Sequence, residues 1–447
     1  MSGPKVVRIV TREEILALCE GHLARVDAAM REWLRIGRRD DCISDAEVSE
    51  AEGRMARLRA LLKADRFMDL QKQAPQEIAF LHQDMQSRLA KVADAAVKAR
   101  SAARRQSEAA VALLAALRKK VAALAPDLEA ALSRVAEGHT DPQALSRGFA
   151  LLEGETAPDA AARQALAQRL KDGSSAPTLA EWIAAQPTTP SDPVLERFEG
   201  RLAELRLLAG PEGAAAFETR LATVLGPGAG PRRNLLLDSL DLDLTAALVA
   251  ARQRDSFAQD LRLTLAELTL VDAASAAAIS ARTVHPDAEL APLLADAHAA
   301  LAKARAALAA QARRAAVLQS LVGLGYEVGE GLATAWVDQG RVVLRKAAQP
   351  DYGVEISGDP AGARMQMRVV AFGDEAGADT VRDQDAETQW CSDVATLQST
   401  LAAAGGGLVI ERALAVGATP VKRVAAPGGA LSRAAREGPT QQTRSRS

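Results

Sequence analysis

The chain has few aromatic residues and few cysteines. Aromatic side chains make up 3% of its 447 residues, and three cysteines are spread widely along it. An odd number of distant cysteines argues against a disulfide framework and indicates a reducing compartment. The first residues, MSGPKVVRIVTREE, reach acidic side chains before any apolar segment, which predicts that there is no signal peptide. We therefore expect a cytoplasmic protein.

A long apolar run and a large net charge are also missing. A membrane-spanning helix needs about 18 apolar residues in succession, and no such run occurs. The net charge of −2 excludes a general electrostatic attraction to nucleic acid or to anionic membranes. The motifs of P-loop proteins, dinucleotide-binding folds, serine hydrolases, zinc peptidases and kinases are absent. The sequence thus predicts no catalytic residue, metal or cofactor, and it does not favour an enzyme.

Alanine is abundant where aromatic residues are scarce. Because ordering an alanine loses no side-chain entropy, alanine favours helices, and its small side chain lets helices pack closely. We predict a mainly α protein, with an elongated helical body of long coiled-coil-like helices and a small C-terminal α+β domain containing an antiparallel sheet. The excess of arginine over lysine, together with the alanine, indicates a GC-rich bacterial genome.

The N-terminal region opens with a short β-prone segment, residues 1–10, which we expect to join the C-terminal sheet. A helical domain is predicted over residues 11–137. Thr11 and Glu14 have the spacing of a capping box, and the helix that they begin is expected to end at Gly37. Ser44 and Glu47 repeat the pattern and predict a second helix to about Ala64.

A long helix is predicted from about residue 76 to 125, after a boundary at Pro75. Apolar residues from Ile78 to Val121 follow one another at steps of three and four, and Ser107 alone interrupts the stripe. Residues 138–284 alternate short helical patterns with glycine and proline, which indicates a region of helical hairpins. Within it, Thr178 and Glu181 predict another helix start.

A second long helix is predicted over residues 285–320, with Pro286 in its first turn. Leucine and alanine from Leu290 to Val322 follow a heptad spacing, which is typical of a helix packed along a partner helix. The partner is the 76–125 helix within the chain, or the same helix of a second protomer through the 290–322 seam. The sequence leaves both open.

The α+β domain is predicted over residues 321–424. LGYEV, ATAWV, RVVLR and two further alternating segments, 352–356 and 365–369, indicate antiparallel strands with one solvated face. A helix from about 385 to 404 and a strand from 408 to 414 follow. Residues 425–447 are rich in glycine, serine and arginine, and we predict a disordered tail.

Cys391 in this domain is a candidate nucleophile. It stands at the edge of the stripe formed by Trp390, Val394 and Leu397, and the acidic side chains near it in sequence would raise its pKa. No histidine follows residue 298. A small core residue is the better interpretation, and a hydrolase of unrecognised type in this domain is the alternative.

Two groups of residues resemble metal ligands. One is the set of acids from residue 374 to 393, which lacks EF-hand spacing and is better explained as a solvated segment that favours the start of a helix. The other is Cys19 and His22, which with Cys42 and His82 have the composition of a zinc site. Because a second close pair of ligands is missing, we do not predict metal there.

Two basic surfaces are candidates for contact with an anionic partner. Arg88, Lys91, Lys98 and Arg105 share one side of the first long helix. In the predicted sheet, alternation places four arginines on the solvated face, at Arg341, Arg345, Arg364 and Arg368. Both surfaces also fit ordinary solvated faces.

The sequence as a whole favours a non-enzymatic structural or adaptor subunit of a bacterial multi-protein assembly. Its long helices would provide spacing or oligomerisation, and its C-terminal domain would dock a protein partner. The alternative is a nucleic-acid-associated accessory protein that binds through the basic helix face.

Overall fold

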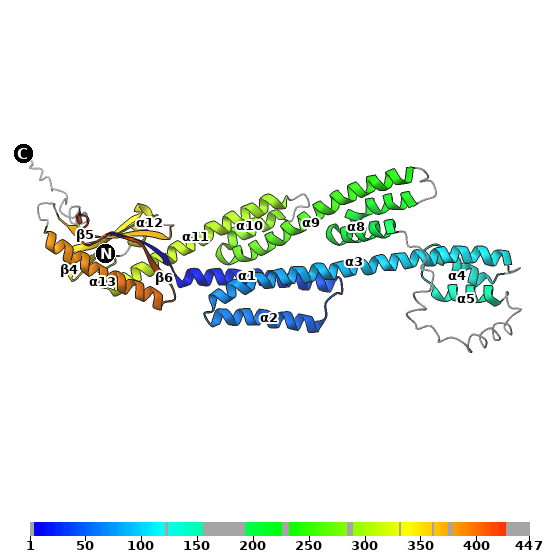
Figure 1. Ribbon diagram of the computed structural model, residues 1–447, viewed down its shortest axis with the longest axis horizontal. Helices are drawn as coiled ribbons and strands as arrows, with labels where there is room; N and C mark the ends of the chain where they lie inside the picture. Colours follow the sequence, from blue (N-terminus) through cyan, green and yellow to red (C-terminus); the bar gives the residue numbers. More distant parts are fainter. Residues whose placement is uncertain are drawn as a thin grey trace, which may run out of the picture. The chain divides into compact units, whose positions relative to one another are not determined.

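The computed structural model describes residues 4–120, 124–154, 193–225, 232–283, 289–329, 332–359, 362–373 and 379–425. The protein is mainly helical and ends in a domain with an antiparallel sheet (Figure 1). The contacts between residues divide the chain into two compact units. One contains residues 1–34, 44–81 and 257–447, and the other contains residues 35–43 and 82–256. None of the helices in the described ranges is both long and apolar enough to cross a membrane.

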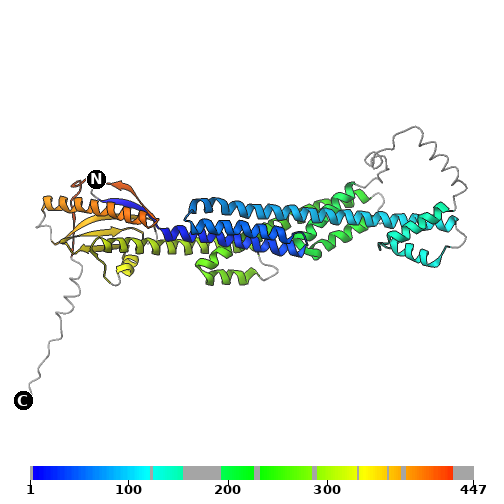
Figure 2. The same ribbon diagram turned by 90° about the horizontal axis from the view of Figure 1, so that it is seen from below.

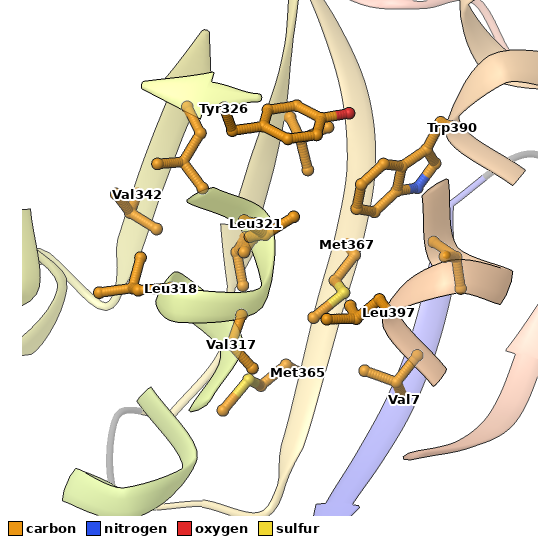
Figure 3. Packing of buried hydrophobic residues seen from close by; sticks show 14 of the residues in the cluster. Val7, Val317, Leu318, Leu321, Tyr326, Val342, Met365, Met367, Trp390 and Leu397 are labelled. Carbon is orange, nitrogen blue, oxygen red and sulfur yellow. The ribbon is translucent and has the colours of Figure 1, made fainter. Parts of the chain in front are cut away.

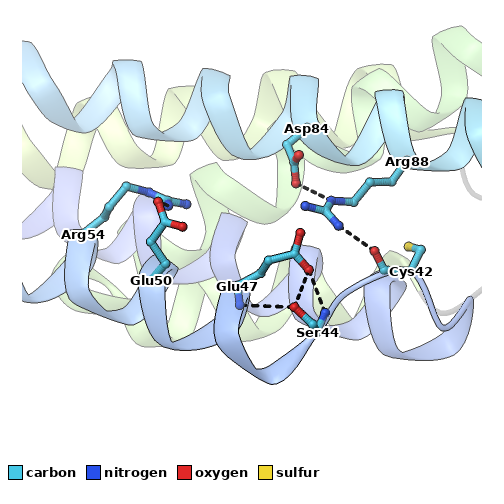
Figure 4. Close-up of polar contacts among 7 residues, drawn as sticks. All are labelled: Cys42, Ser44, Glu47, Glu50, Arg54, Asp84 and Arg88. Carbon is cyan, nitrogen blue, oxygen red and sulfur yellow. Dashed lines mark hydrogen bonds and ion pairs between the residues drawn. The ribbon is translucent and has the colours of Figure 1, made fainter.

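The helices of the N-terminal half are α1 (Arg12–Arg39), α2 (Asp45–Lys63), α3 (Phe67–Lys120), α4 (Pro126–Ala136) and α5 (Pro142–Gly154). The capping box that begins α2 is confirmed, because the Ser44 side chain accepts from the backbone of Glu47 and the Glu47 side chain accepts from that of Ser44 (Figure 4). At α1, the Thr11 hydroxyl accepts from the backbone of Glu14, as predicted.

Two predicted boundaries in this half are wrong. Gly37 lies inside α1, which continues to Arg39, and Pro75 lies inside α3, which already begins at Phe67. Proline removes one backbone hydrogen bond of a helix. Leu70 and Ala74, in the turns before Pro75, are completely buried, and this burial stabilises the helix on both sides of the proline.

The unit formed by residues 35–43 and 82–256 has two apolar clusters. In the first, the end of α3 packs against α4 and α5 through buried residues such as Leu117, Leu132 and Leu145. Ser107, the interruption in the apolar stripe of α3, donates a hydrogen bond of 2.5 Å to the carbonyl of Ala136. The polar residue therefore joins α3 to α4 where an apolar side chain was expected.

The second cluster of this unit joins α8 (Pro193–Leu225) to the first part of α9 (Arg233–Val271), with Phe198 and Leu240 at its centre. The backbone of α8 is kinked at Gly210, whose φ is 76°. Helical hairpins were predicted for residues 138–284, and α9 is longer than those short patterns indicated. The capping box predicted at Thr178 and Glu181 lies outside the described residues.

The other unit contains the remaining helices, α10 (Ala273–Thr283), α11 (Leu290–Gly323), α12 (Leu332–Gln339) and α13 (Thr380–Ala403). The first half of α11 packs on α10 and the end of α9 through Leu293, Ala297 and Leu301. The second half turns a different face inward, with Val317 and Leu321 buried. Pro286, the predicted first turn, lies outside the described residues.

The strands are β1 (Lys5–Val10), β2 (Tyr326–Glu327), β3 (Arg341–Lys346), β4 (Gln349–Ser357), β5 (Arg364–Phe372), β6 (Gly407–Ala413) and β7 (Lys422–Val424). They form one sheet in the order β2-β3-β4-β5-β1-β6, and β7 pairs with β5 in parallel. Every other pairing is antiparallel. The N-terminal segment therefore joins the C-terminal sheet, as predicted, between β5 and β6 (Figure 2).

One predicted strand of this domain is a helix. ATAWV, residues 333–337, lies in α12, which ends at Gln339 just before β3 begins. Trp336 is 1% exposed and belongs to the main core. A short apolar run carries no periodicity that separates strand from helix, and here burial of Trp336 decides the outcome.

The main core lies on one face of the sheet. Val7, Met365 and Met367 point from the strands toward Leu321 of α11 and Leu397 of α13 (Figure 3). Trp390 packs edge-on against Tyr326, with ring centroids 6.1 Å apart. The helices α11, α12 and α13 all contribute to this cluster, so these three helices cover one face of the sheet. In the described residues, the opposite face is formed by side chains of the strands.

Candidate partner-binding surface

The sheet face opposite the core carries a concentration of positive charge, and we refer to it as the outer face. On β3, Val342 and Leu344 are buried in the core, so Arg341 and Arg345 point to the outer face. On β5, Met365 and Met367 are buried in the core, so Arg364 and Arg368 also point to the outer face. The register thus brings the four predicted arginines together on one face.

Three further cations lie on this face and were not among the residues that the sequence singled out. Arg8 of β1 pairs with Arg364 of β5, Arg412 of β6 is opposite Val6, and Lys422 of β7 is opposite Val370. Alternation along a strand predicts which side chains share a face, but it does not predict which strands are neighbours. No sequence signal pointed to β7, which is only three residues long.

Two carboxylates neutralise part of this charge. Glu355, which is 2% exposed, binds Arg368 Nη2 at 2.6 Å and Lys422 Nζ at 2.8 Å. Burial alone would raise the pKa of Glu355, but hydrogen bonds from Lys422 and Arg368, and the charges of these two side chains, outweigh it and lower that pKa. Glu411 binds Arg364 at 2.8 Å and lies 3.7 Å from Arg8.

Three arginines of the outer face form no ion pair in the described part of the chain, although Glu327 of β2 lies opposite Arg345 in the sheet. Among the described residues, no carboxylate lies within ion-pair distance of Arg341, Arg345 or Arg412. Phe372 is the one aromatic side chain among the paired residues of this face, and it is half-buried against Gly353. The face therefore presents separate guanidinium groups with little surface for stacking.

The basic stripe predicted on α3 does not act as one surface. Arg88 is largely buried, and it donates to Asp84 at 2.7 Å and to the carbonyl of Cys42 at 2.6 Å (Figure 4). Lys98 binds Asp94 at 2.7 Å. Lys91 and Arg105 are exposed. Half of the stripe is thus engaged in contacts within the chain.

Cys391 differs from the prediction in one respect. Its neighbours Trp390, Val394 and Leu397 are buried as expected, but its own side chain is only half-buried. Its Sγ accepts a hydrogen bond of 3.2 Å from Nζ of Lys5, which is 386 residues away in sequence. The positive neighbour that was missing locally is supplied by β1.

The acidic segment forms internal contacts where a solvated segment was predicted. Asp393, 5% exposed, accepts from Tyr326 Oη at 2.7 Å and from Lys346 Nζ at 2.6 Å. Asp383 binds Arg423, and Asp379 caps α13. Glu387, 4% exposed, accepts from the backbone of Gly417. Asp374 and Glu375 lie outside the described residues.

Metal-binding geometry is not found where the structure is described: no three histidine, cysteine or acidic side chains cluster closely enough to hold an ion. Cys19 is fully buried, and its thiol lies 3.9 Å from the carbonyl of Phe67 and 3.8 Å from Nε2 of Gln71. Burial raises the pKa of Cys19, and it lowers that of His22.

A hollow of about 480 Å³ lies between α1 and α11, and its lining combines alanine and leucine with charged side chains such as Glu14 and Arg305. Leu308, Gln311 and Ala315, which belong to the predicted heptad seam, are exposed in it. The middle of the seam is therefore uncovered, although Ala297 and Leu301 near its beginning are buried.

Comparison with known proteins gives no relative: no protein-family model, no curated protein and no solved structure matches this chain.

Proposed function

We propose that the protein is a non-enzymatic adaptor subunit whose C-terminal domain binds an acidic segment of a protein partner on the outer face of the sheet. The observation that supports this most directly is the set of three arginines, Arg341, Arg345 and Arg412, that have no carboxylate partner among the described residues. Guanidinium groups bind carboxylates with paired hydrogen bonds, which suits an acidic peptide.

An acidic protein fits this face better than nucleic acid does. Single-stranded nucleic acid is usually bound by aromatic side chains that stack on the bases, and Phe372 is half-buried here. Glu355 and Glu411 stand among the cations and would repel a continuous row of phosphates. A peptide can place its carboxylates between them.

The experiment compares two charge reversals of equal size in the full chain. Arg341→Glu with Arg345→Glu changes the outer face, and Lys91→Glu with Arg105→Glu changes the exposed part of the α3 stripe. Each variant is titrated with a fluorescent glutamate-rich peptide and with single-stranded DNA at two salt concentrations. The proposal expects peptide binding that is lost in the first variant and kept in the second.

The opposite pattern would support the nucleic-acid alternative. DNA binding that is lost in the Lys91 and Arg105 variant, without peptide binding in any form, would replace the adaptor function by an accessory function on nucleic acid. The salt dependence adds a second criterion, because phosphate contacts release counterions and weaken steeply with salt.

We also propose that the uncovered seam of α11 takes a helix of a second protomer. Leu308, Gln311 and Ala315 keep the heptad spacing and line the hollow beside α1. Light scattering after gel filtration tests this: a dimer that becomes a monomer on Ala315→Glu supports the seam, and a wild-type monomer at high concentration refutes it.

A further inference from the structure

Lys5 is a buried amine that has no carboxylate partner in the part of the chain that the structure describes. Its side chain is 2% exposed, and within the described residues its polar contact is the Sγ of Cys391 at 3.2 Å. Burying an ammonium group without a counter-ion is unfavourable. The packing of the sheet therefore keeps the Lys5 side chain buried beside Cys391.

Both side chains are fixed by rigid elements. Lys5 lies in β1 opposite Met367 of β5 and Ala413 of β6, so that it is held by the sheet on both sides. Cys391 lies in α13 between Trp390 and Val394, and both of these neighbours are buried in the core. The nitrogen and the sulfur are therefore held in contact, and no movement of the backbone is needed to bring them together.

Cys391 is half-buried, so a small oxidant can reach its sulfur. Cysteine oxidises first to a sulfenic acid, and a sulfenic acid next to a nitrogen nucleophile condenses to a sulfenamide. The nitrogen is usually that of a backbone amide, but the amine of Lys5 is a stronger nucleophile.

We propose that Lys5 and Cys391 form a covalent nitrogen–sulfur cross-link when the protein meets a peroxide. In the first step the thiol of Cys391 attacks the peroxide, the O–O bond breaks, and hydrogen peroxide yields the sulfenic acid and one water. In the second step the ammonium of Lys5 gives one proton to water, and the resulting amine attacks Sγ; the S–O bond breaks, and the hydroxyl leaves as water with a second proton of the amine. The sulfur is oxidised by two electrons, and the peroxide is reduced.

A thiol reductant reverses the cross-link. Two reductant thiols become one disulfide, and the lysine amine and the cysteine thiol are restored. Because the linkage closes a loop between residues 386 apart in sequence, it restricts the unfolded chain and ties β1 to α13. The linkage would thus be a reversible, redox-controlled cross-link within the C-terminal domain.

The other two cysteines are controls within the same molecule. Cys19 is fully buried and contacts Phe67 and Gln71. Cys42 is half-buried like Cys391, but no described lysine is hydrogen-bonded to its sulfur. Burial raises the pKa of Cys42, and Asp40 adds to the rise. The raised pKa makes Cys42 slow to oxidise, and where peroxide does oxidise it the product should be an oxygen adduct, because no described lysine lies at its sulfur; Cys391 should give the cross-link.

The test is peroxide treatment of the native full-length protein, followed by trypsin digestion and mass spectrometry without reductant. We expect a linked pair of peptides that contain Lys5 and Cys391, about 2 Da lighter than the two free peptides together, because two hydrogens are lost and no oxygen is gained. Trypsin should no longer cleave after Lys5. Dithiothreitol should restore both peptides.

The result that overturns the proposal is oxidation of Cys391 to sulfinic acid, or no oxidation at all, while trypsin still cleaves after Lys5. Two variants check the assignment. Lys5→Arg keeps the charge and Cys391→Ser keeps the size, and each must abolish the linked peptides. Since the main measurement uses the wild-type chain, a variant that folds poorly does not affect it.

Discussion

Arg313 of α11 donates two hydrogen bonds to Glu14 of α1, from Nη2 to Oε1 at 2.7 Å and from Nε to Oε2 at 3.1 Å. The two residues are 299 positions apart, and the Arg313 side chain is 9% exposed. The sequence assigned Glu14 to a capping box with Thr11. Its backbone is indeed capped, but its carboxylate joins α1 to α11.

This ion pair predicts a strong asymmetry between single and double substitutions. Arg313→Met leaves the Glu14 carboxylate beside an apolar hollow, and we expect a loss of about 2 kcal/mol in the free energy of unfolding. Glu14→Leu combined with Arg313→Met removes both charges and should recover most of that loss. Urea unfolding measures all three proteins.

The control for this prediction is an exposed pair. Arg66 and Asp69 lie 2.6 Å apart with side chains 60% and 44% exposed, so Arg66→Met should change stability by about 0.5 kcal/mol or less. Equal losses from Arg66→Met and Arg313→Met would contradict the role given to burial.

The two tyrosines predict how stability depends on alkaline pH. Burial, with a hydrogen bond to Asp383, raises the pKa of Tyr352 to about 12, and burial with a bond to Asp393 raises that of Tyr326. In the unfolded chain a tyrosine has a pKa of about 10. The stabilisation is therefore fully present below about pH 10 and is lost as the pH rises toward about 12.

Tyrosinate absorbance during an alkaline titration measures this directly, because Tyr326 and Tyr352 are the only tyrosines in the sequence. We expect little ionisation until the domain unfolds, so that tyrosinate absorbance and near-ultraviolet circular dichroism change together. Tyr352→Phe should make the loss of stability with pH less steep. Ionisation near pH 10 in a domain that is still folded would refute the prediction.

The two faces of β1 predict effects of very different size for the same substitution. Val7 is fully buried, so Val7→Asp places an unpaired charge in the core and should lower stability by about 4 kcal/mol. Val10 is 38% exposed in the same strand, and Val10→Asp should change stability by about 0.5 kcal/mol or less. Thermal unfolding compares the two.

Hydrogen exchange tells where the Val7→Asp damage lies. Since β1 pairs with β5 and with β6, the amides of these two strands should lose protection, and those of α4 and α5 in the other unit should keep theirs. Unchanged protection of β6 would mean that β1 does not hold this strand in the sheet.

Two glycines predict changes of opposite sign. A Cβ at Gly353 would lie 2.4 Å from the carbonyl of Leu344 and 2.8 Å from the ring of Phe372, so Gly353→Ala should cost about 2 kcal/mol. A Cβ at Gly323, the last residue of α11, meets nothing within 4 Å. Gly323→Ala should therefore stabilise by about 0.5 kcal/mol. Midpoints of urea unfolding decide both.

Local patterns predicted most elements of this fold. The capping box at Ser44, the alternation in β4 and β5 and the stripe of α13 each lie within a short segment, where the chain's own geometry relates one residue to the next. ATAWV was wrongly predicted as a strand, because a run of five residues is too short for its hydrophobic period to separate strand from helix. Pro75 misled because burial of its neighbours Leu70 and Ala74 overrides its local preference.

In the candidate sites, too, local patterns predicted part of the arrangement, and contacts between distant segments determine the rest. Alternation placed Arg341 and Arg345 of β3 on the solvated face, but only the strand order shows that Arg412 of β6 and Lys422 of β7 belong to the same sheet. Cys391 was judged by its sequence neighbours, and its nearest amine, Lys5, lies 386 residues earlier. The sequence predicted that β1 joins the C-terminal sheet, but a local pattern does not show which strands it lies between or which side chains it brings into contact.

The position of β1 also constrains how the protein is made. Val7 pairs with Met365, and at 5–20 residues per second the ribosome needs roughly 20 to 70 s to reach that partner. During this time Val7 and Ile9, completely buried in the finished sheet, have nothing to pair with. The sheet cannot close while the chain is growing, so newly made molecules expose an apolar strand to chaperones and to one another until synthesis reaches β5.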